Sequence, residues 1–146
     1  MKKIALALIA LLMAVLPVAA RDKVYRDSSV LPAAARATLT KAFPKAKVNR
    51  VKVDKGVFGK CDYEVVLSNG AEIEFNSKGE WKEVDCGHQA VPDVFVMKQI
   101  RQYISSNYKG AKIVQIEKND NSYDIELSNG IDLEFDRSGR FLRIDD

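Results

Sequence analysis

Two stretches of the chain repeat apolar residues with a helical period, and each is followed by short stretches in which apolar and polar residues alternate. In the first, Leu31, Ala35 and Leu39 stand four positions apart, which places them on one face of a helix. Pro32 suits the first turn of this helix and Pro44 cannot continue it. We therefore predict a helix over 32–43.

The second helical stretch has the same kind of apolar stripe, formed by Val96, Ile100 and Ile104. Here Pro92 suits the start of a helix, and Gly110 suits the position after its end. The pattern predicts a second, longer helix that starts at Pro92 and ends near Gly110.

Each predicted helix is followed by four stretches with the period-two alternation of half-buried strands. We place them at 48–53, 62–67, 71–76 and 80–85, and again at 113–118, 122–127, 131–136 and 140–145. Residues 63–85 and 123–145 share nine identical positions, including Leu-Ser-Asn-Gly at 67–70 and 127–130. This self-similarity predicts a tandem duplication with repeats over 21–88 and 89–146.

The Leu-Ser-Asn-Gly turns determine how neighbouring strands pair. A three-residue loop with the glycine in the left-handed conformation sets Val65 opposite Ile73 and Tyr63 opposite Phe75, so that apolar side chains share one face. A two-residue loop would instead place apolar side chains beside charges. We predict an α+β fold with two layers, in which a helix covers a four-stranded antiparallel sheet, twice over.

The first twenty residues have the composition of a secretory signal. Lys2 and Lys3 precede an apolar run from Ile4 to Leu16, and Val18 and Ala20 occupy the small-residue positions of a cleavage site. The run is shorter than the roughly 20 residues that a spanning helix needs. We expect a signal peptide over 1–20, cleavage after Ala20, and no membrane insertion of the mature chain.

Removal of this segment changes the charge balance. Residues 1–20 hold two lysines and no acids, so the formal net charge of +3 becomes +1 in the mature chain. Such a balanced chain lacks the one-sided basic field of a nucleic-acid binder. We expect no nucleic-acid partner.

The chain holds few side chains suited to catalysis or to metal binding. His88 is the only histidine, and Cys61 and Cys86 do not stand at the spacings of zinc sites. A single imidazole in a linker also argues against Ser-His-Asp and Cys-His enzymes. We predict no catalytic residue, no metal and no cofactor. The two cysteines either form a disulfide after export or stay as free or intermolecular thiols, and both arrangements remain open.

The pattern LP…FPKAKV…YEVVLSNGAEIEFNSKGEWKEVDC, followed by VP and a second copy, resembles the tandem PepSY-like proteins of the Gram-negative periplasm. Their fold is also described as β-lactamase-inhibitor-like. The resemblance extends from about Asp27 to the end of the chain. It implies a periplasmic location and a duplicated unit of helix and four-stranded antiparallel sheet, but no activity and no site residues.

Two functions from different classes fit these features. The first is a non-enzymatic binding or inhibitory module that presents a face of its sheet to an unidentified periplasmic protein or peptide, which the suspected protease-restraining role of PepSY domains also suggests. The alternative is a carrier of a cation or small ligand that uses the acidic outer face of the sheet.

The candidate binding surface is the outer sheet face of the second repeat. The predicted register sets Asp124 opposite Glu134, and like charges across a strand pair are unfavourable. In the first repeat we expect Lys82 to face Glu74 and to offset such repulsion, whereas the second repeat has Leu142 at the equivalent position. A mixture of acidic and exposed apolar groups suits a binding surface. We predict that the partner-binding face consists of Asp124, Glu126, Asp132, Glu134, Leu142 and Ile144.

Overall fold

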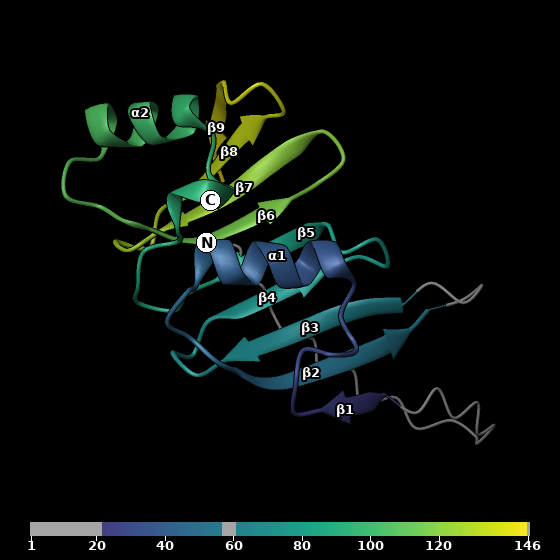
Figure 1. Cartoon of the computed structure of the whole chain (residues 1–146). Helices are drawn as coiled ribbons and strands as arrows, with labels where there is room; N and C mark the ends of the chain where they lie inside the picture. Colours follow the sequence, from purple (N-terminus) through teal and green to yellow (C-terminus); the bar gives the residue numbers. More distant parts are fainter. Residues whose placement is uncertain (1–21, 57–60, 146) are drawn as a thin grey trace, which may run out of the picture.

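The computed structural model of the protein describes residues 22–56 and 61–145 (Figure 1). The predicted signal peptide over 1–20 and its cleavage after Ala20 lie outside the described residues. None of the described helices is long and apolar enough to cross a membrane.

Two helices, one 3-10 turn and nine strands make up the described chain. Their bounds in chain order are β1 Lys23–Tyr25, α1 Ala33–Ala42, β2 Val48–Lys55, β3 Cys61–Leu67, β4 Glu72–Phe75, β5 Trp81–Asp85, η2 Asp93–Phe95, α2 Lys98–Asn107, β6 Ile113–Lys118, β7 Ser122–Leu127, β8 Asp132–Asp136 and β9 Phe141–Ile144.

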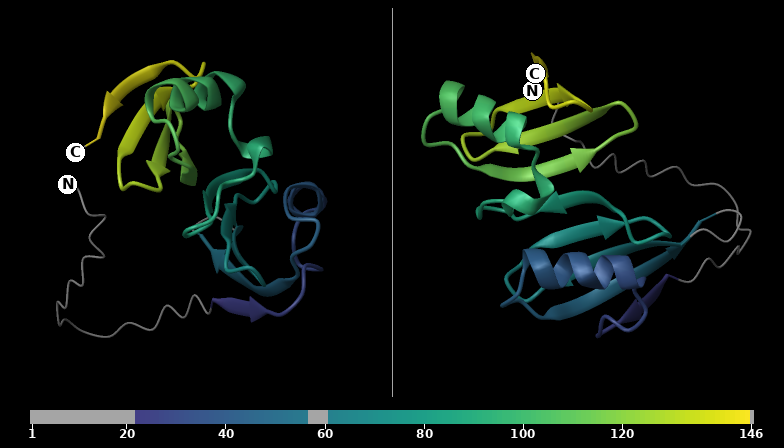
Figure 2. Two further views of the ribbon diagram at one scale, coloured as in Figure 1. Left: turned by 90° about the vertical axis from the view of Figure 1, so that its left-hand side faces the viewer. Right: turned by 45° about the horizontal axis from the view of Figure 1, so that its top comes forward.

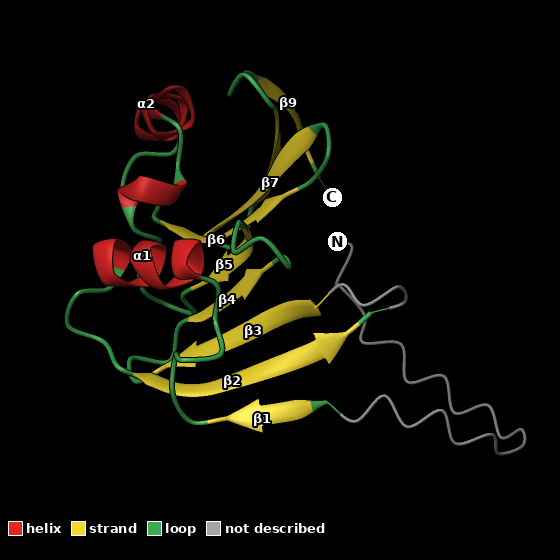
Figure 3. Cartoon of the chain, turned by 45° about the vertical axis from the view of Figure 1, so that its right-hand side comes forward, coloured by secondary structure: helices red, strands yellow, loops and turns green. Residues whose placement is uncertain are grey.

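The nine strands form one antiparallel sheet in the order of the chain, from β1 to β9. Both helices lie on the same face of this sheet and leave its outer face open (Figure 3). The predicted α+β class is therefore confirmed. Because β5 pairs with β6, the two predicted sets of strands belong to one sheet. The short β1, which the sequence pattern did not predict, pairs with β2 as a ninth strand. The tandem duplication stays a prediction.

The predicted register of the first hairpin is confirmed. Val65 pairs with Ile73, and Tyr63 pairs with Phe75. Gly70 has a φ of 85°, which is the left-handed conformation that the three-residue loop requires. The second hairpin pairs in the same way at the equivalent positions, so one face of the sheet is apolar across both halves.

The apolar face of the sheet packs against the apolar stripes of the helices. Leu39 of α1 and Ile100 and Ile104 of α2 are buried, and Phe75 and Phe135 of the sheet have no exposed surface. Full burial of a phenylalanine is worth roughly 1.5–3 kcal/mol. This contact holds both helices on the sheet and leaves the polar side chains of the strands on the outer face.

Gly79, in the turn between β4 and β5, allows the start of α1 to lie directly on the sheet. Its φ is 82°, and a Cβ atom there would lie 2.8 Å from Cβ of Pro32 and 2.9 Å from the backbone nitrogen of Ala35. Real Cβ atoms essentially never lie within 3.0 Å of a heavy atom from another part of the chain, so the contact requires glycine for space as well as for conformation.

The prediction that the second helix starts at Pro92 is wrong. Pro92 precedes the 3-10 turn η2, and α2 begins only at Lys98. The turn buries Phe95 between the halves, where its ring centroid lies 6.0 Å from that of Phe43 and 5.5 Å from that of Trp81. Burial of this aromatic side chain at the junction favours the break over a helix continuing from Pro92.

Cys61 and Cys86 are not bonded to each other in the structure, and the intermolecular alternative stays a prediction. Cys61 begins β3 and Cys86 follows β5, and these two strands both run antiparallel to β4. The thiols therefore lie at opposite ends of the sheet, and the structure has no bridge between them. Burial, and then the charge of Asp85, raise the pKa of Cys86 to about 11.

Candidate functional site

A row of six carboxylates runs across the outer face of the sheet, one from each of six neighbouring strands. Each pairs directly with the next across the strand boundary, in the order Glu64, Glu74, Glu83, Glu117, Asp124 and Glu134. We call these six residues the carboxylate row. Lys52 pairs with its first member and Arg143 with its last. The carboxylate row is therefore flanked by one basic residue at each end.

A second line of polar residues runs beside the carboxylate row, two positions along each strand. Its members pair in the order Glu72, Asp85, Gln115, Glu126 and Asp132. Four of the five are acidic, so the outer face concentrates negative charge over the width of six strands, on a chain whose total charge is nearly balanced.

Cations neutralise only the ends of the carboxylate row within the described residues. Arg50 lies 3.0 Å from Glu64, and Arg143 lies 2.7 Å from Glu134. At the centre, the amide of Gln115 donates a short hydrogen bond to Glu83. The four central carboxylates have no ion pair with a described cation, so the repulsion between them is only partly offset, by the more distant charges of Lys82 and Arg143.

Burial and mutual repulsion both act on the central carboxyl groups. Burial raises the pKa of Glu83, and the charges of Glu74 and Glu117 raise it further. Burial also raises the pKa of Glu117, with Asp124 and Glu74 adding to the shift. The pKa of Asp124 is raised in the same way, by burial and then by the charge of Glu134. A positive group on this surface would stabilise the ionised forms.

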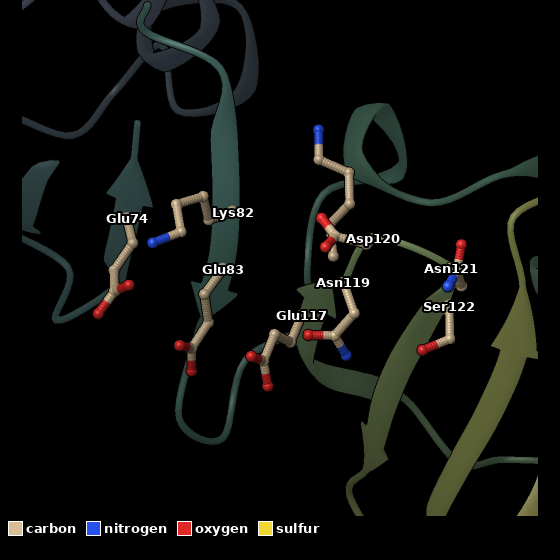
Figure 4. Close-up of a pocket in the computed structure, with 9 residues that line it drawn as sticks. Glu74, Lys82, Glu83, Glu117, Asn119, Asp120, Asn121 and Ser122 are labelled. Atoms are coloured by element: carbon tan, nitrogen blue, oxygen red, sulfur yellow. The ribbon is translucent and has the colours of Figure 1, made fainter. Parts of the chain in front are cut away.

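A shallow cavity of about 520 Å³ lies at the centre of the carboxylate row. Figure 4 shows the carboxylates of Glu74, Glu83 and Glu117 side by side on three neighbouring strands, with the turn over 119–122 at the edge of the cavity. In this turn, Asn119 donates a hydrogen bond of 2.8 Å to Asp124. Lys82 and Lys118 also line the cavity, so an entering cationic group would meet these carboxylates beside two cations of the chain itself.

The structure divides the six predicted site residues between four places. Asp124 and Glu134 belong to the carboxylate row, and Glu126 and Asp132 belong to the line beside it. Leu142 lies in the bulge of β9 and is 47% exposed. Ile144 is also exposed, but it pairs with Leu133, whose side chain faces the core. Ile144 therefore does not share the outer face with the acids.

The expected contact between Lys82 and Glu74 is wrong. A bulge in β5 makes Glu83 the partner of Glu74, and Lys82 instead lies 3.2 Å from Asp62. The equivalent bulge in β9 makes Arg143 the partner of Glu134. Repulsion is therefore relieved in the second half and increased in the first, which is the reverse of the expectation.

Glu83 and Glu117, at the centre of the site, were missed by sequence reasoning. They become neighbours only because β5 pairs with β6, and nothing in the sequence of either half alone indicates that pairing. The only available signal was the number of outward acidic positions in β5 and β6. In the part of the chain that the structure describes, no group of three or more His, Cys, Asp or Glu side chains is arranged to hold a metal ion.

Comparisons with known proteins show that the chain is similar to proteins described as periplasmic. Residues 61–143 match the model of the family described as "Putative beta-lactamase-inhibitor-like, PepSY-like". A "putative periplasmic protein of unknown function" from Bacteroides vulgatus is 44% identical, with a TM-score of 0.81 over 86% of this chain and 99% of that one. No curated protein matches the chain.

Two further solved structures are similar over nearly their whole length. A "putative calcium-regulated periplasmic protein" from Bacteroides thetaiotaomicron is 34% identical, with a TM-score of 0.79 over 86% of this chain and 97% of that one. A "putative periplasmic protein from DUF2874 family" from Bacteroides vulgatus is 35% identical, with a TM-score of 0.79 over 88% of this chain and 99% of that one.

Proposed function

Since the chain belongs to the PepSY-like family and is similar to solved proteins that are described as periplasmic, we propose that it is a non-enzymatic periplasmic binding module. Its outer sheet face holds a basic segment of a protein or peptide. The observation that carries this proposal is the carboxylate row, in which six acidic side chains from six strands stand in direct register.

The row is an unfavourable arrangement for a surface that only meets solvent. Like charges directly across a strand pair destabilise a sheet, by an amount on the order of 0.2–1 kcal/mol for each pair. The row contains five such contacts, and its ion pairs lie at the ends. Lysine or arginine side chains of a partner would remove this repulsion on binding, so part of the binding free energy comes from strain already present in the free chain.

The spacing of the row favours a helical partner. Neighbouring strands lie about 4.8 Å apart, so the six carboxylates extend over about 24 Å. A helix rises about 1.5 Å per residue, so basic side chains three or four residues apart repeat at about 4.5–6 Å. A helix that lies across the strands can therefore oppose one basic side chain to most of the carboxylates.

The test is calorimetric titration with a helical alanine-rich probe peptide that carries lysine at every third or fourth position. We expect binding that weakens with salt, and an affinity at least tenfold lower for Glu83→Gln with Glu117→Gln. The matched control, Asp27→Asn with Glu80→Gln, changes the net charge equally away from the row and should bind as the unaltered chain does. Equal affinity for both double variants would place the binding surface elsewhere.

A second candidate is binding of a divalent cation, because a 34% identical relative is described as calcium-regulated. Calcium takes six to eight oxygen ligands, and Glu83 and Glu117 offer neighbouring carboxylates at the central cavity. Against it, the described residues hold no preformed metal cluster.

Thermal denaturation separates the two candidates. A rise in melting temperature with calcium, larger than that with magnesium at equal ionic strength and lost in Glu83→Gln with Glu117→Gln, would favour the cation. Equal effects of calcium, magnesium and sodium chloride at matched ionic strength would exclude it.

A further inference from the structure

The helix side of the molecule carries two equivalent grooves, one in each half. Each lies between a helix, the connection after it and the start of the next strand: α1 and β2 enclose about 390 Å³, and α2 and β6 enclose about 660 Å³. Within 36–48, eight residues that line the first groove have counterparts sixty-five positions later that line the second. Figure 2 shows the two helices in equivalent places over their strands.

Both grooves are basic. Arg36 on α1 and Lys47 before β2 line the first groove, and Arg101 and Lys112 occupy the equivalent places in the second. Neither helix contains an acidic residue, and each groove has one aspartate among its lining residues. A ligand in either groove would therefore carry negative charge.

The walls between the cations are apolar. Leu39 and Phe43 line the first groove, and Ile104 and Tyr108 line the second. The aromatic residue caps the C-terminal end of the helix in each case, where the helix dipole is negative. That end disfavours a doubly charged phosphate more than a singly charged carboxylate, and the apolar walls favour an anion on an aliphatic stem.

Arg101 retains donor capacity within the second groove. Its Nη1 atom donates to Oδ2 of Asp93 at 2.7 Å, while its buried Nε has no hydrogen-bond partner among the described residues. A guanidinium offers five donors in a planar fork that matches a carboxylate. An entering carboxylate can accept from the accessible part of the guanidinium, since the Arg101 side chain as a whole is 41% exposed.

We propose that the two grooves are paired sites for acidic side chains of a partner protein, each holding one glutamate. The carboxylate meets the arginine and lysine, and the aliphatic stem packs on Leu39 or Ile104. These sites lie on the side of the sheet opposite the carboxylate row, and their occupation does not depend on the function proposed for that row.

The experiment follows amide chemical shifts of the ¹⁵N-labelled exported chain during titration with the peptide acetyl-Leu-Glu-Leu-amide. We expect shifts over both 36–48 and 101–113. Arg36→Gln should weaken binding at least tenfold in the first groove only, and Arg101→Gln in the second only. Lys41→Gln, exposed on α1 but outside the groove lining, should leave both unchanged. Asp93→Asn should strengthen the second site severalfold, because it frees Arg101.

Three results would overturn the proposal. The first is equal binding of acetyl-Leu-Gln-Leu-amide, which would show that binding does not depend on the negative charge of the peptide. The second is tighter binding of inorganic phosphate at the same residues, which would contradict the carboxylate assignment. The third is salt-sensitive self-association that requires Arg36 and Arg101, which would assign the grooves to a second copy of the chain.

Discussion

At the scale of single residues, the position of Glu117 explains why the outer face is strained. It stands directly between Glu83 and Asp124 across two strand boundaries, and no described cation lies within ion-pair distance of it. Its charge is therefore unfavourable to the fold, whereas Glu80, which accepts a hydrogen bond from Asn76 at 2.8 Å, is favourable.

We predict that Glu117→Gln raises the free energy of unfolding at pH 7 by about 0.5–1 kcal/mol, because it removes two like-charge contacts. Urea denaturation measures the change. The gain should disappear at pH 4, where the neighbouring carboxyl groups take up protons, and Glu80→Gln should give no gain at either pH. A variant that is less stable than the unaltered chain at pH 7 contradicts this view of the row.

The raised pKa values of Glu83, Glu117 and Asp124 also set the direction of the pH dependence. An acid with a higher pKa in the folded state binds protons more strongly when folded, so stability falls as the pH rises through that pKa. Unfolded Asp and Glu titrate near about 4. We expect the free energy of unfolding to increase as the pH is lowered from 7 to about 5.

Asp136 acts in the opposite direction at lower pH. Hydrogen bonds from Ser138 and from the backbone of Arg140 hold its pKa at about 2, so its contribution to stability is lost as the pH falls from about 4 toward 2. Denaturation at intervals from pH 3 to 8 should show a maximum below neutrality. Stability that rises steadily up to pH 8 would be inconsistent with a strained row.

These residues also show which cross-strand partners could be predicted from the sequence. Asp124 opposite Glu134 was predicted correctly, because the register follows from the turn glycine and from the alternation of apolar residues. The partner of Glu74 was predicted incorrectly, because a bulge adds one residue to β5 and moves Glu83 into the place expected for Lys82. A single inserted residue shifts every later side chain, and alternation alone does not locate it.

At the scale of elements, the turns control how helices meet the sheet. Gly70 and Gly79 both have positive φ angles, but a Cβ at Gly70 would meet nothing within 4 Å, whereas one at Gly79 would clash with the start of α1. The two positions therefore separate the conformational cost of a side chain from its steric cost.

We predict that Gly79→Ala destabilises the protein by about 1–3 kcal/mol more than Gly70→Ala, because only the first overpacks the contact with α1. Both variants carry the conformational cost of about 1–2 kcal/mol, so the difference isolates the contact. Thermal or urea denaturation of the two variants gives this difference. Equal losses would show that α1 does not rest on the turn.

The ends of helices and strands could be predicted where a local sequence signal determines them. They could not be predicted where packing between distant segments determines them. The strands lie within about two residues of the predicted ranges, because turn glycines bound most of them. The start of α2 was misplaced because Pro92 is compatible with a helix, and only the burial of Phe95 against Trp81 shows why the chain forms η2 instead. That contact joins distant segments and has no local signature.

At the scale of the whole molecule, the continuous sheet makes the two halves one folding unit. The pairs Val84 with Ile116 and Asp85 with Gln115 join β5 to β6, and Phe95 fills the junction on the helix side. The pattern of each half predicted its own hairpins, but the join between the halves depends on contacts that neither half encodes alone.

We predict a single cooperative unfolding transition. Trp81 is the only tryptophan, and its ring packs against Tyr123 and Lys118 of the second half, so its fluorescence reports the junction between the halves, while far-UV circular dichroism reports the whole sheet. The two transitions should coincide in urea. A biphasic dichroism curve with fluorescence following one phase would show that the halves unfold separately.

The charges are also arranged at this scale. Acids gather on the outer face of the sheet, while both helices are free of acids and border basic grooves. A nearly neutral chain therefore presents two oppositely charged sides, and the acidic side is the one for which we propose a basic partner.

The most direct measurement of this proposal is the map of amide chemical shifts in the ¹⁵N-labelled chain during titration with the lysine-bearing helical peptide. We predict that the largest shifts lie in β4 to β7 and centre on Glu83 and Glu117, that they diminish as salt is raised, and that Glu83→Gln with Glu117→Gln removes them. Shifts that lie outside the outer face, or that persist unchanged in the double variant, would contradict the account.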